Sequence, residues 1–221
     1  MAPIINISES DFERASKILE LARINYTSPS KEGFVYVPSI NLWVAKERKF
    51  CGENWFNSHK KLQAGGERMP TIPEFIEFLK YSKGNFPEIY KEITEVRAPR
   101  RAEWLDADFK VKDKRLYVNS NHVLDEKGNL VPKNSELLDE RTLMKDRTPG
   151  ISLESWLANP TKQGLPPKET KSGDLFYWCP RSEDNSVARF FVYSDWVGFS
   201  CYGFPSDRGA DLGVRAVKKQ E

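Results

Sequence analysis

The chain has 221 residues, 39% of them hydrophobic and 30% charged, a balance that excludes wholesale disorder and favours a water-soluble globular protein. Its formal net charge of +2, without a basic tail or stripe, argues against nucleic acid as a partner. No apolar run approaches the roughly 18 residues that a membrane span needs, so membrane insertion is not expected.

Cysteine and histidine are scarce. Cys51, Cys179 and Cys201 are too far apart to form a disulfide framework, and no C-x-x-C pair accompanies His59 and His122. The sequence therefore predicts neither a metal site nor a cofactor.

The N-terminus, residues 1–7, lacks the charged and apolar regions of a signal peptide. Synthesis in the cytosol is expected, and association with a virion remains open.

The N-terminal half contains four segments with helical apolar spacing or helix-capping residues. They are expected at residues 10–24, 52–62, 72–84 and from residue 87 onward. Thr71 and Glu74 form a capping box at the start of the third helix. Two short strands are expected at residues 34–37 and 42–45, with a turn between them.

After Pro99 the helical periodicity disappears and extended segments take its place. Strands are expected at residues 107–112, 115–124 and 129–131, with a hairpin turn at 125–128 and a break at 148–150. One or two helical turns at 152–157 precede an exposed loop at 159–173. Residues 175–217 alternate as strands do.

Residues 187–202 show period-two alternation, which predicts two strands that each bury one face. The buried faces are apolar. The opposite faces combine large aromatic side chains with polar and charged ones. A mixture of this kind is typical of recognition surfaces, because Tyr and Trp offer much contact area at low entropic cost. The alternative is that both faces are buried, one against the helices and one under the 159–173 loop.

Three motifs resemble those of a known family. They are Arg68-Met69-Pro70-Thr71 before a helix, Glu103-Trp104 within residues 102–107, and the ending Gly213-Val214-Arg215-Ala216-Val217. Together they resemble C-type-lectin-fold proteins, in the subgroup of formylglycine-generating enzymes and the variable proteins of diversity-generating retroelements. The resemblance implies an α+β class, with helices packed on a small, twisted, mostly antiparallel sheet. It also implies a single domain over residues 1–221.

The resemblance separates two functions. Formylglycine-generating enzymes use a cysteine pair near the C-terminus and an Arg-Gly-Gly-Ser-Trp stretch, and this sequence has neither. Calcium-dependent lectins use Glu-Pro-Asn or Trp-Asn-Asp, which are also absent. What remains is a retroelement variable protein of a phage, an archaeal virus or a cell. In that family, adenine-directed mutagenesis rewrites codons of the ligand-binding face and leaves the fold-forming residues unchanged.

The variable, ligand-binding region is expected at about residues 187–212. Its partner would be a protein or another macromolecule. No catalytic residue is expected in this chain, and its oligomeric state is open. The expected binding residues are Arg189, Phe191, Tyr193, Trp196, Ser200, Tyr202, Phe204, Asp207, Arg208, Gly209 and Asp211. The expected fold-forming residues are Ala188, Phe190, Phe199, Cys201, Pro205, Leu212, Gly213, Val214 and Arg215.

Two other functions stay open. One is an oxidase-like enzyme of the formylglycine-generating type that depends on Cys179 or Cys201, and the other is a viral structural protein. The acidic group Glu103, Asp106 and Asp108 could do acid–base work, but a solvated strand end or a salt-bridge site is the favoured interpretation.

Overall fold

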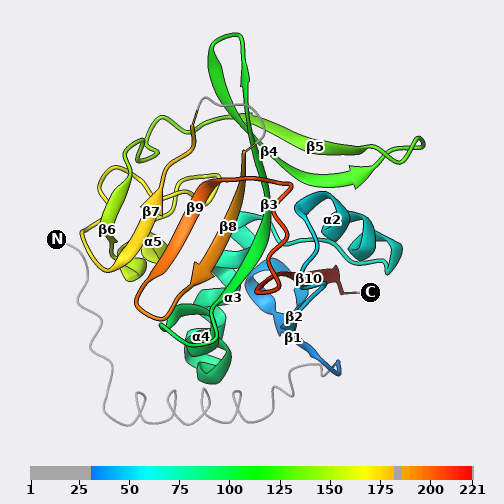
Figure 1. Ribbon diagram of the computed structural model, residues 1–221, viewed down its shortest axis with the longest axis horizontal. Coiled ribbons are helices and arrows are strands. Elements are labelled where there is room, and N and C mark those ends of the chain that lie inside the picture. Colours follow the sequence, from blue (N-terminus) through cyan, green and yellow to red (C-terminus); the bar gives the residue numbers. More distant parts are fainter. Residues whose placement is uncertain (1–30, 182–185, 221) are drawn as a thin grey trace, which may run out of the picture. The chain divides into compact units, whose positions relative to one another are not determined.

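The computed structural model describes residues 31–181 and 186–220 (Figure 1). The helix expected at residues 10–24 lies outside them and stays a prediction, as does the N-terminal part of the single domain expected over 1–221. Residues from 33 onward belong to one compact unit.

The described strands form one ten-stranded mixed sheet. Its order is β1-β2-β10-β3-β8-β9-β7-β6, and β4 pairs with both β3 and β5 beside this path. The pairs β10/β3 and β7/β9 are parallel and the other pairs are antiparallel. The strands are β1 (Phe34–Val37), β2 (Leu42–Lys49), β3 (Arg101–Lys112), β4 (Arg115–Leu124), β5 (Leu130–Leu137), β6 (Arg147–Ile151), β7 (Leu175–Trp178), β8 (Ser186–Val192), β9 (Val197–Gly203) and β10 (Leu212–Lys219).

The helix predicted at residues 72–84 begins where its capping box predicts, whereas the one expected at 52–62 begins at Trp55. The Thr71 hydroxyl accepts the Glu74 N–H and the Glu74 carboxylate accepts the Thr71 N–H, so the predicted capping box is present. Asn54 and Ser152 cap two further helices with their side chains. The helices are α2 (Trp55–Ala64), α3 (Ile72–Asn85), α4 (Pro87–Thr94) and α5 (Leu153–Ala158), with a 3₁₀ turn at Pro38–Ile40.

The predicted fold class is wrong. Strands account for 42% of the structure and helices for 22%, and the sheet is a large mixed one. A C-type lectin fold with helices on a small, mostly antiparallel sheet does not describe it. The strand predicted at residues 115–124 is confirmed as β4. The short pieces expected at 107–112 and 129–131 belong to strands of 12 and 8 residues, so the sheet is larger than expected.

The sheet has a hydrophobic core on each face. On one face, which we call the inner face, α3, α4 and α5 pack on β8 and β9, as in the contact of Phe75 with Phe190. On the opposite, outer face, α2 covers β10 and β3 through Trp55 and Leu62. Figure 1 looks onto the outer face of β7, β8 and β9, with α3 behind the sheet.

Two predictions about the connecting segments are wrong. The break expected at residues 148–150 lies inside β6, which is an edge strand and so tolerates a proline. The loop expected to be exposed at 159–173 buries Thr161 and Leu165. Leu165 joins the core of the inner face, so the buried part of this loop does not cover the outer face.

Candidate functional site

The two predicted strands are present as β8 and β9, and their side chains alternate between the faces of the sheet. The prediction that each strand buries only one face is wrong, because Phe191 and Ser200 on the opposite face are also buried. Ala188, Phe190 and Val192 are fully buried on the inner face, and so are Phe199 and Cys201. Every second side chain therefore points to the outer face, as a strand requires.

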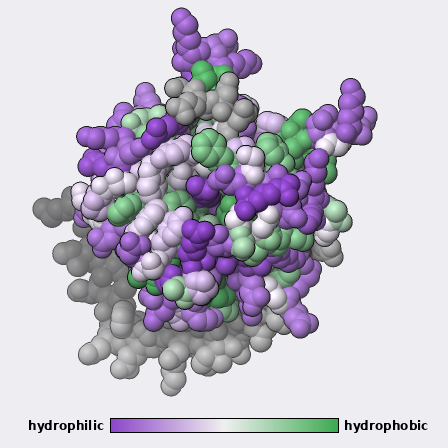
Figure 2. Space-filling view, viewed as in Figure 1, coloured by the Kyte–Doolittle hydropathy of each residue, from purple (hydrophilic) through white to green (hydrophobic). Residues whose placement is uncertain are grey.

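Five aromatic side chains gather on the outer face, and we call them the aromatic cluster: Phe176, Trp178, Phe191, Tyr193 and Trp196. Seven ring pairs connect them, with centroids 4.5 to 6.0 Å apart. The register explains the assembly, because Phe176 of β7 and Phe191 of β8 both lie beside Gly198 of β9. All members except Phe191 are partly exposed. Figure 2 shows pale, weakly polar side chains over β7 and β9 and strongly hydrophilic ones beside them.

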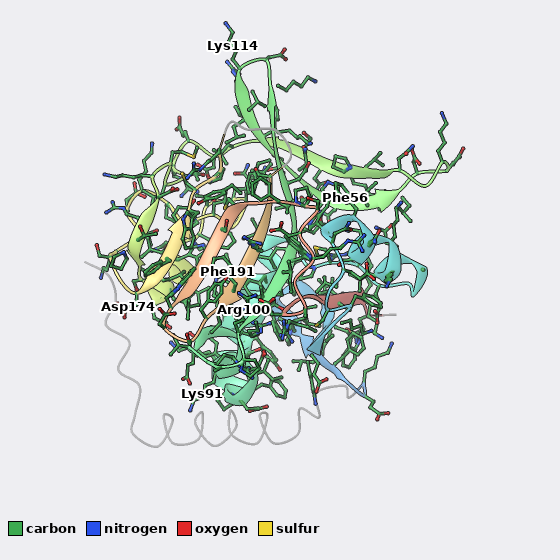
Figure 3. All side chains as sticks on the ribbon, in the orientation of Figure 1. Phe56, Lys91, Arg100, Lys114, Asp174 and Phe191 are labelled. Carbon is green, nitrogen blue, oxygen red and sulfur yellow. The ribbon has the colours of Figure 1, made fainter. Side chains whose placement is uncertain are left out.

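A depression of about 360 Å³ lies at one side of the aromatic cluster. Arg189 pairs with Asp207 at 2.9 Å, and Arg100 pairs with Asp211 at 3.3 Å. The Arg100 guanidinium also lies 5.6 Å from the centre of the Tyr193 ring. Figure 3 shows Arg100 close to Phe191. The lining residues are Arg100, Ala102, Arg189, Phe191, Tyr193, Asp207, Arg208, Gly209, Asp211 and Leu212.

A second depression, of about 490 Å³, lies at the other side of the aromatic cluster. Phe176 and Trp196 line it together with the start of α5 and the segment 172–175. The Trp196 ring also contacts Tyr193, which lines the first depression, with centroids 4.5 Å apart. The two depressions and the rings between them therefore form one continuous surface.

Seven of the eleven predicted binding residues line the first depression and Trp196 lines the second. The other three, Ser200, Tyr202 and Phe204, line neither. The Arg181 guanidinium instead lies over Tyr202, 4.2 Å from the centre of the Tyr202 ring. Phe204 is 67% exposed. Ser200 and Phe191 are only 4% and 6% exposed, so they support the face from beneath.

The sequence missed three contributors to this surface, namely Phe176, Trp178 and Arg100. The run from residue 175 to 178 is Leu-Phe-Tyr-Trp, in which every residue is apolar or aromatic, so its alternation cannot be seen. Arg100 directly precedes β3, far from β8 in the sequence. Only the pairing of β3 with β8 brings it to the aromatic cluster.

The thiols of Cys179 and Cys201 are free and buried. The residues just before them, Trp178 and Ser200, are paired on neighbouring strands. Burial raises the pKa of Cys179 to about 12, and burial also raises that of Cys201 well above its usual range. Both thiols are therefore protonated at neutral pH, which does not favour nucleophilic or metal-binding cysteine chemistry.

The acidic group of β3 divides into two sites. The Glu103 carboxylate is buried between Arg101 and Arg215, each 3.1 Å away. Burial opposes ionisation, but these two arginines hold the pKa of Glu103 below its usual value. The predicted salt-bridge site is confirmed for this residue.

Asp106 and Asp108 face two histidines instead. His122 Nδ1 lies 2.5 Å from Asp106 Oδ1, and His122 Nε2 lies 3.3 Å from Asp108 Oδ1. His59 Nε2 lies 3.6 Å from the same Asp106 oxygen. Burial lowers the pKa of His59 to about 4. Burial also opposes the charge on His122, but the neighbouring Asp106 and Asp108 carboxylates raise its pKa to about 9.

His59, Asp106 and His122 are the one group of the described residues that could hold a metal ion. This group could not be predicted from the sequence, because its members are separated by 47 and 16 positions and follow no ligand-spacing motif.

No protein-family model, curated protein or solved structure matches this chain. None of the helices in the described residues combines the length and apolar character that crossing a membrane requires. The function therefore has to be inferred from the arrangement of the side chains.

Proposed function

We propose that this protein recognises another protein through the outer face of β7, β8 and β9. The observation that carries the proposal is the aromatic cluster, whose partly exposed rings lie between two depressions. Aromatic anchors of this kind supply most of the binding energy in protein interfaces when they are desolvated at the centre of the contact.

The charged residues beside the aromatic cluster suit the rim of such an interface. The Arg189–Asp207 and Arg100–Asp211 pairs are partly exposed and add about 0–1 kcal/mol each to the stability of the free protein. Because these pairs are weakly held, their side chains can exchange partners when a ligand docks. Charges at a rim mainly set the orientation and the association rate.

The enzyme alternative is not favoured, because the thiols of Cys179 and Cys201 are buried and have raised pKa values. No observation favours a structural role in a virion over recognition.

The experiment that tests recognition uses the full chain immobilised as bait for host-cell proteins. The variants are Trp196→Ala, which removes the central ring of the aromatic cluster, and Phe56→Ala, which removes a 43% exposed ring on α2. We expect a protein that the wild type and the Phe56 variant retain and the Trp196 variant loses, by about 2 kcal/mol or roughly 30-fold in affinity. Retention of the same proteins by all three baits would contradict the proposal.

We further propose that this face is diversified in a population, as the resemblance to retroelement variable proteins implies. The difference in burial between the expected fold-forming and binding residues supports this proposal. All nine expected fold-forming residues are buried, whereas nine of the eleven expected binding residues are partly or fully exposed.

Sequencing the locus in many members of one population tests diversification. Substitutions should concentrate between residues 187 and 212, fall at adenines, and spare Phe190 and Phe199. An even spread of substitutions along the gene would refute diversification and leave recognition itself intact.

A further inference from the structure

Three potential metal ligands meet away from the recognition face. His59 comes from α2, Asp106 from β3 and His122 from β4. One ligand atom of each lies within 4.8 Å of the other two. A helix and two paired strands thus bring these side chains together, and none of the three belongs to the recognition face.

The side chain of His59 has no hydrogen-bond partner among the described residues, although it is fully buried. Its Nε2 points at Asp106 Oδ1 from 3.6 Å, which is too far for a hydrogen bond. A buried polar group without a partner loses its water contacts and gains nothing in return. A cation between these two atoms would give the His59 ring a ligand bond.

The other two residues already have the supporting contacts that metal ligands need. Asp106 Oδ2 accepts the backbone N–H of His122 at 3.1 Å, which fixes the carboxylate. The His122 ring turns Nδ1 toward Asp106 and Nε2 toward the Asp108 carboxylate at 3.3 Å. A carboxylate on the far nitrogen of a histidine is the usual support for a metal-binding imidazole, because it orients the ring and raises its basicity.

We propose that His59 Nε2, Asp106 Oδ1 and His122 Nδ1 bind one divalent first-row transition-metal ion of the zinc type. Two imidazole nitrogens and one carboxylate oxygen are a donor set that such ions accept. Ligand atoms about 2.0–2.1 Å from a tetrahedral zinc ion lie about 3.3–3.4 Å apart. The His59–Asp106 separation already has nearly this value, and the His122–Asp106 contact has to open by about 0.8–0.9 Å.

Two depressions border the site. Asp106 lines a depression of about 170 Å³, and His122 and Asp108 line another of about 190 Å³. The Trp55 ring packs edge-on against both imidazoles, with centroids 4.3 and 4.9 Å away. The side chains of His59 and Asp106 have no exposed surface, so the site is screened from bulk water. A bound ion would connect α2 to β3 and β4, and so stabilise the folded chain.

The test is calorimetric titration of zinc chloride into the full chain after treatment with a chelator. The wild type should bind one zinc ion per chain and melt at a higher temperature with zinc than with chelator. His59→Phe keeps an aromatic ring against Trp55 but removes the ligand. It should bind zinc at least 100-fold more weakly, a greater loss than that of a supporting partner.

The melting temperatures of the wild type and the His59→Phe variant, with and without zinc, give an independent test of the site. Without metal, His59→Phe should melt no lower than the wild type, because it removes two buried ring nitrogens that have no hydrogen-bond partner. With zinc, the wild type should melt higher. Asp108→Asn should keep one site per chain and lose roughly 10–100-fold in affinity.

Cys51→Ser controls for zinc bound by the exposed thiol, and it should bind zinc as the wild type does. Equal zinc binding by the wild type and His59→Phe would overturn the proposal. So would a wild type that binds no zinc, which would leave the group as a buried histidine–carboxylate ion pair.

Discussion

Gly198 decides how closely the aromatic cluster packs on β9. A Cβ atom built at this residue would lie 2.6 Å from the Phe191 ring and 2.9 Å from the Trp178 ring. The two rings thus occupy the space that any other side chain would fill. Glycine is required here for room, because its backbone angles are those of an ordinary strand.

Gly198→Ala should therefore displace the rings and destabilise the protein by about 1–3 kcal/mol, the usual cost of overpacking. Urea denaturation measures the change. Gly84→Ala is the matched control, because a Cβ there meets no atom within 4 Å in an exposed position of α3. It should stabilise the protein by about 0.5–1 kcal/mol. A Gly198 variant as stable as the wild type would show that the rings are not held as described.

Among the elements, those with a local signal were predictable. The alternation of β8 and β9 could be recognised because buried Ala188, Phe190 and Phe199 alternate with polar or aromatic neighbours. The capping box of Thr71 and Glu74 likewise marks the start of α3 within one residue. Such signals depend only on neighbours in the chain, and no tertiary contact is needed to see them.

Elements whose burial depends on tertiary contacts were not predictable. The loop at residues 159–173 has a polar, Pro- and Gly-rich composition, yet Leu165 enters the inner core and the Trp156 indole donates a hydrogen bond to Gly164. The metal-ligand group is a similar case. His59 and His122 come together only because α2 lies against the β3–β4 hairpin, and no local pattern encodes that contact.

At the scale of the whole molecule, sequence motifs could not determine the size of the sheet. The ending Gly213–Val217 does form a buried strand, but β10 lies between β2 and β3, and one of its two pairings is parallel. The place and direction of β10 follow from contacts with segments more than 100 residues away. The position of the candidate recognition face was easier to predict from the sequence, because it depends mainly on β8, β9 and the loop that follows them.

The arrangement of the molecule also predicts which surface a ligand covers. Within residues 31–181 and 186–220, no helix covers the outer face of β7, β8 and β9, whereas α3, α4 and α5 occupy the opposite face and α2 covers β10 and β3. A ligand docked on the aromatic cluster would shield Tyr193 and Trp196 and leave α2 uncovered.

Hydroxyl-radical footprinting of the protein with and without its captured ligand tests the recognition face most directly. We expect the oxidation of Tyr193 and Trp196 to fall several-fold in the complex, while that of the exposed Phe56 ring on α2 stays unchanged. Protection of Phe56 together with unchanged oxidation of Tyr193 and Trp196 would contradict the account.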